Sequence, residues 1–256
     1  MGHKVNPICL RLNLTHNWRS RWFTPEKKLF VQYIQEDRTI RQMLRKELAA
    51  AAVARVEIER SPDRVRVLIH TARPGILIGR RGENIQRLQE AVQRIVGTDR
   101  QLKMDYLEIT NPAIEAQLIA DSLAFQLEKR IAFRRAMKRA IQQAMEAGAK
   151  GIRVICDGRL GGAEMTRREG YRMGKVPLGT LRADIDFGQG LAHTPLGCIG
   201  TRVWVCKGML NLKGRRGATA TAQAQAPATV KAAPAPAAAA VTPGAQEPSP
   251  VAPVSP

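Results

Sequence analysis

The sequence predicts an α+β protein with two domains, preceded by a basic arm and followed by a disordered tail. Segments of helical and strand periodicity follow one another in the order αββααβ up to residue 111. Asn111-Pro112 then repeats a helix-start signal and opens a second series of helices and strands. From residue 214 the chain is rich in alanine and proline and almost uncharged, so it cannot offset its ordering entropy. The predicted boundaries are 1–23 for the arm, 24–111 and 112–213 for the domains, and 214–256 for the tail.

The elements of the first domain are predicted from caps and periodicity. A helix starts at residues 24–26, where an N-cap threonine precedes proline and glutamate. Two segments that alternate apolar and charged residues, Val53–Arg60 and Arg64–Thr71, predict strands joined by a turn. A short helix at 74–78, a helix at 83–96 and a strand at 102–110 complete the series.

The second domain is predicted to hold two helices packed on a mainly antiparallel sheet. The helices are expected at 113–131 and 134–147, and strands at 152–157, 181–187 and 199–206. The segment between Arg159 and Lys175 is rich in glycine and arginine. It fits either a long strand pair or a loop packed against a partner.

A turn between two helices of the first domain is the strongest candidate for binding a phosphate backbone. Residues 77–88 read LIGRRGENIQRL, with two glycines three residues apart between apolar residues at helical spacing. Glycine adopts positive φ and lets another backbone approach, and the following helix points N–H groups at the turn. A helix–helix turn with an incidental arginine pair is the alternative, but the long pattern favours nucleic acid. The predicted RNA-binding residues are Gly79, Arg80, Arg81 and Gly82.

A second candidate site is one face of the helix at 134–147. At 100° per residue its cations fall opposite the apolar Met137 and Ile141. A solvated surface usually mixes charge signs, whereas residues 129–139 contain no acidic residue, which favours nucleic acid over a bland exposed face. The predicted face consists of Arg134, Arg135, Lys138 and Arg139.

Composition indicates a polyanion as the partner. The formal charge is +19, and residues 217–256 carry only one cation and one anion, so the excess lies on the first 216 residues. An anionic membrane is the competing hypothesis, but no apolar run is long enough to span a bilayer. Aromatic residues make up 4%, so phosphate contacts must carry more of the binding than base stacking. Weaker contacts to rRNA or neighbouring proteins are predicted for Lys4, Arg11, Arg159, Arg167, Arg168 and Arg172.

No cofactor, metal or small-molecule substrate is expected. The four cysteines lack C-x-x-C spacing and are predicted to be buried thiols of a reducing compartment, and the four histidines are scattered. No signal peptide or myristoylation signal is recognisable at the start of the sequence. We therefore predict a cytoplasmic protein without a membrane partner.

The element order αββααβ, with its GRRG turn, resembles the type II KH domain of bacterial proteins. Several stretches also resemble the S three family of bacterial small-subunit ribosomal proteins: MGHKVNP at the start, GRRG, FRRAMKRA (133–140), RLGGAEM (159–165) and LRADIDFG (181–188). The resemblance covers residues 1–213 in the family's order. His3 stands where the family usually has glutamine, and the tail lies outside the common core.

The resemblance implies a constituent of the head of the small ribosomal subunit that binds small-subunit rRNA beside the ribosomal proteins S ten and S fourteen. It also implies a position at the entrance of the mRNA channel. There Arg134, Arg135 and Lys138, which match the family's FRRAMKR motif, would contact incoming mRNA and help to unwind it. No nucleotide-hydrolysis motif is recognisable, so the expected mechanism is electrostatic.

Two other functions were weighed against this one. A KH-type transcription-elongation or RNA-binding factor outside the ribosome would predict a second GxxG or a further RNA-binding barrel, and residues 112–213 show neither. A nuclease would need carboxylates for Mg²⁺, for which Asp157, Glu164, Asp184 and Asp186 are the candidates. Asp184 and Asp186 lie on the same face of a strand, where pairing with neighbouring arginines is the expected explanation, so the sequence predicts a protein that is not an enzyme.

Overall fold

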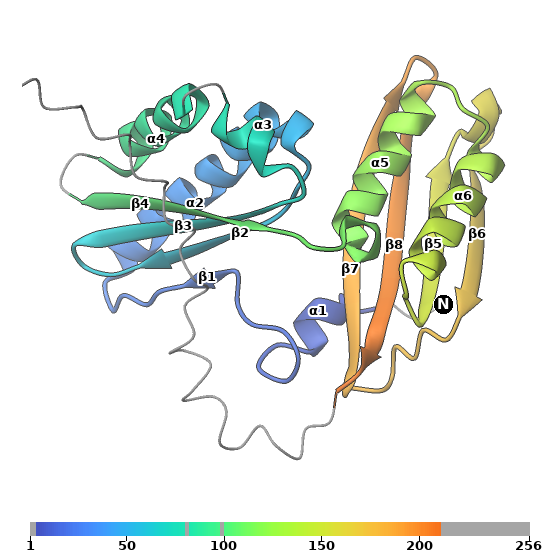
Figure 1. The fold of residues 1–256 in the computed structure, drawn as a ribbon, viewed down its shortest axis with the longest axis horizontal. Helices are drawn as coiled ribbons and strands as arrows, with labels where there is room; N and C mark the ends of the chain where they lie inside the picture. The colour runs from blue at the N-terminus through green and yellow to red at the C-terminus, as the bar shows by residue number, and fades with distance from the viewer. Residues whose placement is uncertain (1–3, 80–81, 98–99, 211–256) are drawn as a thin grey trace, which may run out of the picture. The chain divides into compact units, whose positions relative to one another are not determined.

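The structure, a computed structural model, describes residues 4–79, 82–97 and 100–210, which contain two four-stranded sheets (Figure 1). The predicted tail, 214–256, lies outside the described residues, as do Arg80 and Arg81. Among the described residues, no helix has the length and apolar character needed to cross a bilayer. Each sheet has its own hydrophobic core, and the α+β class is confirmed.

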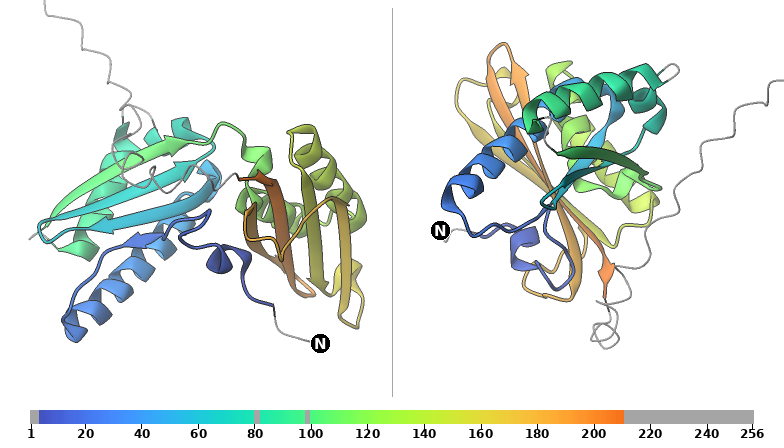
Figure 2. Two further views of the ribbon diagram at one scale, coloured as in Figure 1. Left: turned by 90° about the horizontal axis from the view of Figure 1, so that it is seen from below. Right: turned by 90° about the vertical axis from the view of Figure 1, so that its left-hand side faces the viewer.

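The first sheet has the strand order β1-β2-β3-β4. Its strands β2 and β3 are antiparallel, whereas β3 pairs with β4 in parallel. Helices α2 and α4 lie on the same face of this sheet, which the right-hand view of Figure 2 shows. The elements are β1 (Ser20–Arg21), α2 (Lys27–Glu47), β2 (Val53–Arg60), β3 (Arg64–Thr71), α3 (Pro74–Ile78), α4 (Glu83–Val96) and β4 (Gln101–Glu108). The predicted order αββααβ is confirmed.

The second sheet is antiparallel throughout, in the order β6-β5-β8-β7, with α5 and α6 on one face. The glycine- and arginine-rich segment after β5 forms strand β6 along the outer edge of β5, so the strand-pair alternative is the one adopted. The elements are α5 (Ala116–Glu128), α6 (Phe133–Glu146), β5 (Gly151–Gly158), β6 (Arg167–Gly174), β7 (Ala183–Thr194) and β8 (Gly197–Met209).

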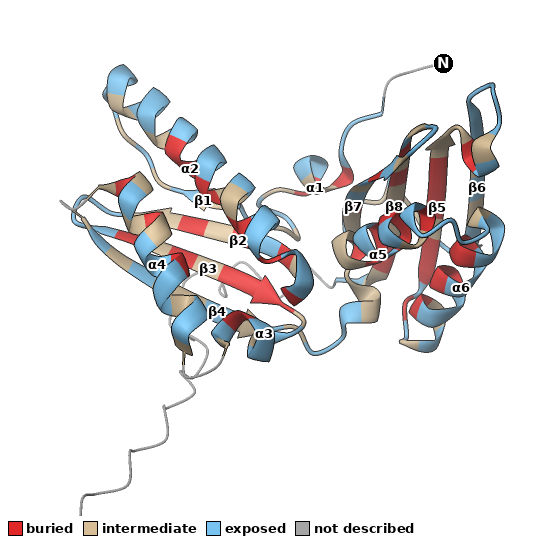
Figure 3. Ribbon diagram, turned by 90° about the horizontal axis from the view of Figure 1, so that it is seen from above, coloured by how far each residue is buried: buried red, intermediate tan, exposed pale blue. Residues whose placement is uncertain are grey.

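Strand alternation determines which face of each sheet is buried (Figure 3). In β3 the residues Val65, Val67 and Ile69 are fully buried against α2 and α4. In the second sheet helix α5 approaches β7 closely because the strand carries glycine where the helix lies against it. A Cβ on Gly188 would overlap the carbonyl of Ala116, and one on Gly190 would lie 2.6 Å from the Ala120 oxygen. Gly188 is the last residue of the LRADIDFG stretch. The close packing of α5 on β7 therefore explains why this stretch ends in glycine.

Two predicted helix starts are wrong, because in each case a side-chain contact outside the cap signal overrides it. Helix α2 begins at Lys27, with Glu26 rather than Thr24 at the N-cap position. The ring of Trp22 packs edge-on against Phe30, and this contact sets the path of the chain into the helix.

Helix α5 begins at Ala116, after a 3-10 turn at Pro112–Ile114. The carboxylate of Asp186 on β7 accepts the Ala116 N–H at 2.9 Å and so supplies the cap from another element. Among the described residues the cation that pairs with Asp186 is Lys207, at 3.9 Å, so the predicted pairing of this carboxylate with an arginine is wrong.

The arm is not simply extended, because it contains helix α1 (Pro7–Leu10), capped by Asn6. The side chain of Arg11 is fully buried. Its Nε donates to the Ala183 carbonyl at 2.8 Å, and its Nη2 donates to the Leu178 and Thr180 carbonyls at 2.9 Å each. Burial lowers the pKa of this guanidinium, which carbonyl dipoles keep in its charged form. The prediction that Arg11 is available to a phosphate is therefore wrong.

A buried ion cluster joins α2 to β2 and the arm. The guanidinium of Arg60 donates to Glu36 at 2.5 Å and to Asp37 at 2.6 Å, and all three side chains are nearly inaccessible to water. The other oxygen of Asp37 accepts from Ser20 at 3.0 Å and from the indole of Trp22 at 2.9 Å. Every charge in this cluster thus has a partner, as burial requires.

The prediction of four buried thiols is half wrong. All four cysteines are free, but Cys9 and Cys198 are exposed, whereas Cys156 and Cys206 are buried. Burial raises the pKa of the Cys156 thiol to about 12, so this group stays protonated and unreactive at neutral pH.

Replacing Arg60 by methionine should destabilise the protein by about 3–5 kcal/mol, because the buried Asp37 loses its ion pair and Glu36 keeps only the longer one to Arg100, at 3.9 Å. Chemical denaturation of the variant and the wild type measures this difference. Arg66→Met is the control, because its half-exposed partner Asp105 remains accessible to water. Equal losses in the two variants would contradict the assignment.

Replacing Arg11 by methionine should cost at least about 2 kcal/mol, since several buried carbonyls lose a charged donor. We expect faster proteolysis of the segment between β6 and β7, which Arg11 holds through its carbonyls. Lys4→Met, a change at an exposed position of the same arm, should leave the cleavage rate unchanged. Unchanged cleavage in Arg11→Met would show that the guanidinium does not hold this segment.

Candidate nucleic-acid interface

Helix α6 presents its cations on one face because its apolar residues recur at helical spacing. Ala136, Met137, Ala140, Ile141 and Ala144 are buried against the second sheet. The four cations predicted for the opposite face, Arg134, Arg135, Lys138 and Arg139, are all exposed. The predicted placement of these four side chains is confirmed.

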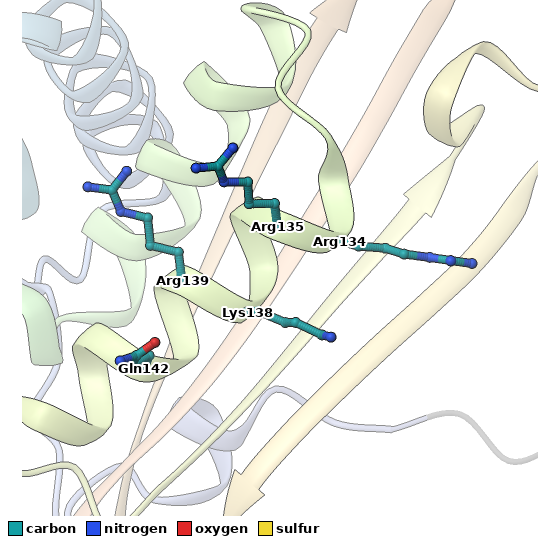
Figure 4. A pocket seen from close by; sticks show the side chains of 5 residues that line it. All are labelled: Arg134, Arg135, Lys138, Arg139 and Gln142. Carbon is teal, nitrogen blue, oxygen red and sulfur yellow. The ribbon is translucent and has the colours of Figure 1, made fainter.

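The cationic face, defined as Arg134, Arg135, Lys138 and Arg139, borders an open depression of about 550 Å³ together with Gln142. Figure 4 shows Arg134 and Lys138 extending to one side of the helix and Arg135 and Arg139 to the other. Four cations and no carboxylate line the depression. A chain of phosphates laid along the helix could therefore meet cations on both sides.

One carboxylate partly neutralises the positive charge of this face. Glu169 on β6 lies 3.9 Å from the guanidinium of Arg134, but it also makes a closer ion pair with Arg167. Within the described ranges, Arg135, Lys138 and Arg139 have no ion pair. The expectation of an unopposed face thus holds for three of the four cations.

The cations stand at the end of α6 where they stabilise the helix least. The N-terminus of a helix carries partial positive charge, and a cation placed there costs about 0.3–1 kcal/mol. Arg134 and Arg135 lie in the first turn, which has no acidic residue and no side-chain cap. A bound anion would satisfy the free N–H groups and the arginines together. An arrangement that opposes helix stability is typical of a functional site.

The turn between α3 and α4 has the backbone that the sequence predicts. Gly79 has φ +71° and Gly82 has φ +81°, so both lie in the region that favours glycine. Gly82 is the N-cap residue of α4, and a Cβ there would meet nothing within 4 Å. Nothing is described for Arg80 and Arg81, so their contact with RNA stays a prediction.

The residues predicted to make weaker contacts have different roles in the structure. Lys4 and Arg172 are exposed. Arg159 donates to the carbonyls of Ala163 at 2.9 Å and Leu196 at 2.7 Å, so it braces two loops. Arg168 pairs with Asp157 at 3.0 Å, on the sheet face opposite α6. Their contacts to rRNA or proteins stay predictions.

Sequence reasoning missed two residues on the face of the second sheet that the helices leave uncovered. Arg153 stands opposite Arg172 on one side and Trp204 on the other, with its guanidinium 5.4 Å from the Trp204 ring. Arg202 forms an ion pair with Asp157 on the same face. Alternation could have identified both, because each lies between buried residues of a strand.

The carboxylates weighed for Mg²⁺ do not come together. Asp157 is engaged by Arg168 and Arg202, Asp186 caps α5, and Asp184 lies 3.4 Å from His16. In the part of the chain that the structure describes, no group of three or more acidic, histidine or cysteine side chains could hold a metal ion.

Comparison with known proteins assigns a family to both sheets. A family model described as "KH domain" matches residues 39–114, and one described as "Ribosomal protein S3, C-terminal domain" matches residues 123–205. A "Small ribosomal subunit protein uS3" from Methylacidiphilum infernorum is 51% identical over 207 residues, covering 81% of this chain and 96% of that protein.

The chain belongs to the uS3 family of small ribosomal subunit proteins. The relative from Myxococcus xanthus is 52% identical over 208 residues, covering 81% of this chain and 93% of its own length. That from Sulfurimonas denitrificans is 51% identical over 214 residues, covering 84% and 88%.

Membership of the uS3 family confirms the resemblance and the KH domain. It identifies the chain as a structural constituent of the small ribosomal subunit rather than an enzyme. The hypotheses of a nuclease and of a KH factor outside the ribosome are thereby overturned.

Replacing Gly82 by alanine should weaken RNA binding more than it weakens the fold. Positive φ costs an alanine about 1–2 kcal/mol, and the methyl group would also occupy the open space at the turn. Gly97→Ala, at the other end of α4, is the control for backbone strain, because its φ of +91° and ψ of 165° suit an alanine even less than the left-handed conformation of Gly82. We expect Gly97→Ala to lose at least as much unfolding free energy as Gly82→Ala, and Gly82→Ala to lose more RNA affinity, measured by fluorescence anisotropy. Equal affinities would show that the turn does not clamp RNA.

Proposed function

We propose that the chain binds small-subunit rRNA in the head of the subunit and holds incoming mRNA on the cationic face of α6. The observation that carries the mRNA assignment is the set of cations at the N-terminal half of this helix, three of them without a carboxylate partner in the part of the chain that the structure describes. The resemblance of the FRRAMKR stretch to the family motif supports the same assignment. The GxxG turn, with Gly79 and Gly82 at positive φ, supports a clamp on an RNA backbone.

The proposed mechanism is electrostatic. Exposed cations bind phosphates in either strand of a duplex and release condensed counterions, without reading base sequence. Cations on both sides of α6 would hold single strands apart after the translocating ribosome has pulled them open. The helix itself supplies no energy for unwinding, which agrees with a sequence in which no nucleotide-hydrolysis motif is recognisable.

We keep the predicted division at 24–111 and 112–213, with the KH turn on the first domain and the mRNA-binding face of α6 on the second. The ribosomal proteins S ten and S fourteen are the proposed neighbours. Arg167, Arg168 and Arg172 of β6 are proposed to contact rRNA or these proteins. Arg172 is the most available of the three, because Arg167 and Arg168 pair with Glu169 and Asp157, whereas Arg172 has no ion pair within the described residues.

Replacing Arg134, Arg135 and Lys138 together by alanine should leave the fold and assembly intact, because these side chains point away from the core. Translation through a stable mRNA hairpin should slow by at least about threefold, which corresponds to the loss of one exposed ion pair. Translation of an unstructured message should change little. A reconstituted translation assay with both messages measures the difference.

A control triple variant removes the same charge from cations that already have carboxylate partners, namely Arg21, Arg66 and Arg94. It should translate both messages like the wild type. If the α6 variant fails to enter the subunit, its cations bind rRNA or protein and the mRNA assignment is wrong.

A further inference from the structure

Helix α5 carries a large aromatic side chain on its solvent side. Phe125 is 56% exposed. At 100° per residue it falls opposite Leu123 and Leu127, which are buried in the core of the second sheet. The ring therefore stands outside that core. A single exposed apolar side chain is common on protein surfaces, so the function of Phe125 has to be inferred from its neighbours.

Phe125 shares a surface with the cationic face of α6. Helices α5 and α6 cover the same face of the second sheet, so their solvent sides point the same way (Figure 1). Residues 129–132 join them, which places the last turns of α5 beside the first turns of α6. Helix α6 packs on β5 and β6, and α5 packs on β7 and β8. Arg134 extends toward β6, so Arg135 and Arg139, which extend to the other side of α6 in Figure 4, lie toward α5.

A cation already lies over one face of the aromatic ring. The ammonium nitrogen of Lys129 is 4.2 Å from the centre of the Phe125 ring, within the range of a cation–π contact. The contact orients the ring and covers one of its two faces. Because more than half of the Phe125 side chain is exposed, the opposite face is accessible to a planar group such as a nucleobase.

The residue after Lys129 keeps a cation at a position where glycine would suit the fold better. Helix α5 ends with the Arg130 N–H donating to the Leu127 carbonyl at 3.0 Å and the Ile131 N–H donating to the Gln126 carbonyl at 3.1 Å. Glycine is the usual residue at the positive-φ position of such an ending, but here Arg130 adopts φ +57°. Backbone strain that a glycine would relieve is typical of a functional site.

The carboxylates of α5 that lie closest in the chain are engaged by other groups. Asp121 accepts a hydrogen bond from the Gln117 amide at 2.9 Å, and Glu128 accepts one from the backbone N–H of His193 at 3.0 Å. Within the described ranges, neither Lys129 nor Arg130 forms an ion pair. Both cations are thus available to phosphates, like those of α6.

We propose that Phe125 stacks on an unpaired base of the mRNA whose phosphates the cationic face of α6 binds, and that Lys129 and Arg130 bind the phosphates that flank this base. The ring holds the base out of the duplex, so that the separated strands do not pair again before the message advances. Base–aromatic stacking accepts every base, as a surface that receives all messages requires. This inference rests on the proposed function and assigns a base-binding residue to the same surface.

RNA fits this surface better than a protein does. An aromatic ring among cations is the composition of surfaces that bind single-stranded nucleic acid. A protein partner would favour a contiguous apolar patch. Ile131 is also exposed, at 41%, but the other solvent-side residues near Phe125 on α5 are polar, among them Asp121, Ser122 and Gln126.

The position of Phe125 is tested with the photo-crosslinking amino acid benzoylphenylalanine at position 125 of the full chain. Ribosomes that carry this chain are stalled on a message with a hairpin at the channel entrance and irradiated. The chain should become joined to the message beside the hairpin. A cross-link to rRNA or to a protein, or no cross-link, would overturn the proposal. The same amino acid at position 23, where the natural Phe23 is 87% exposed, is the control and should not capture the message.

The stacking itself is tested by Phe125→Leu, which keeps an apolar side chain but removes the π-face. Passage through a stable hairpin in a reconstituted translation assay should slow by at least about fivefold, which corresponds to the lower end of base–aromatic stacking, about 1 kcal/mol. Phe125→Trp should retain the wild-type rate, and Phe23→Leu is the matched control. An unchanged rate for Phe125→Leu would overturn the proposal.

The variant at positions 134, 135 and 138 separates this inference from the proposed function. If that variant slows passage through the hairpin and Phe125→Leu does not, the stacking proposal alone is wrong. If Phe125→Leu slows passage and the α6 variant does not, the phosphate-binding role of α6 is wrong and the stacking role of Phe125 stands.

Discussion

The structure depends on one constraint: in this strongly basic chain, a cation that the fold encloses must find an anion or a carbonyl. The sequence has 41 lysines and arginines and 22 acidic residues, so carboxylates are the scarce partner. Arg60 takes two of them in the buried cluster with Glu36 and Asp37. On the face of the first sheet away from its helices, Arg21 and Arg66 share Glu57, Glu59 and Asp105. Arg11, which makes no ion pair with a carboxylate in the described residues, is surrounded by carbonyls instead. The cations left without partners are those that the fold exposes, and α6 collects three of them on one face.

Cations with partners and cations without partners also differ in role: the first stabilise the fold, and the second are available to bind RNA. Arginines that fix the fold are buried or chelated by carbonyls and carboxylates, and their loss leaves uncompensated charge or unsatisfied acceptors. Arg135, Lys138 and Arg139 stand on a helix that packs through alanine, methionine and isoleucine, so they contribute nothing to its core. Arg135 also lies in the first turn of α6, where a cation opposes the helix dipole.

Much of this could be predicted from the sequence. The αββααβ order follows from alternation in β2 and β3 and from the glycines at positions 79 and 82, whose positive φ the pattern requires. The cationic face of α6 follows from helical spacing alone. What the sequence did not reveal depends on contacts between residues far apart in the chain. Arg11 is buried by carbonyls more than 160 positions away, and α5 is capped by a carboxylate from β7. The exposure of Cys9 and Cys198 likewise depends on packing rather than on cysteine spacing.

The central claim, that unpaired cations on α6 bind RNA phosphates, is tested most directly by the salt dependence of binding. The affinity of the purified chain for single-stranded RNA would be measured across a series of salt concentrations for the wild type and for the alanine variant at positions 134, 135 and 138. Each phosphate contact on a single strand contributes about 0.7 to the slope of log affinity against log salt, so three lost contacts lower it by about 2. The account predicts this loss of slope for the α6 variant and a much smaller one for the variant at positions 21, 66 and 94, whose cations are already paired. Equal changes of slope in the two variants would contradict it.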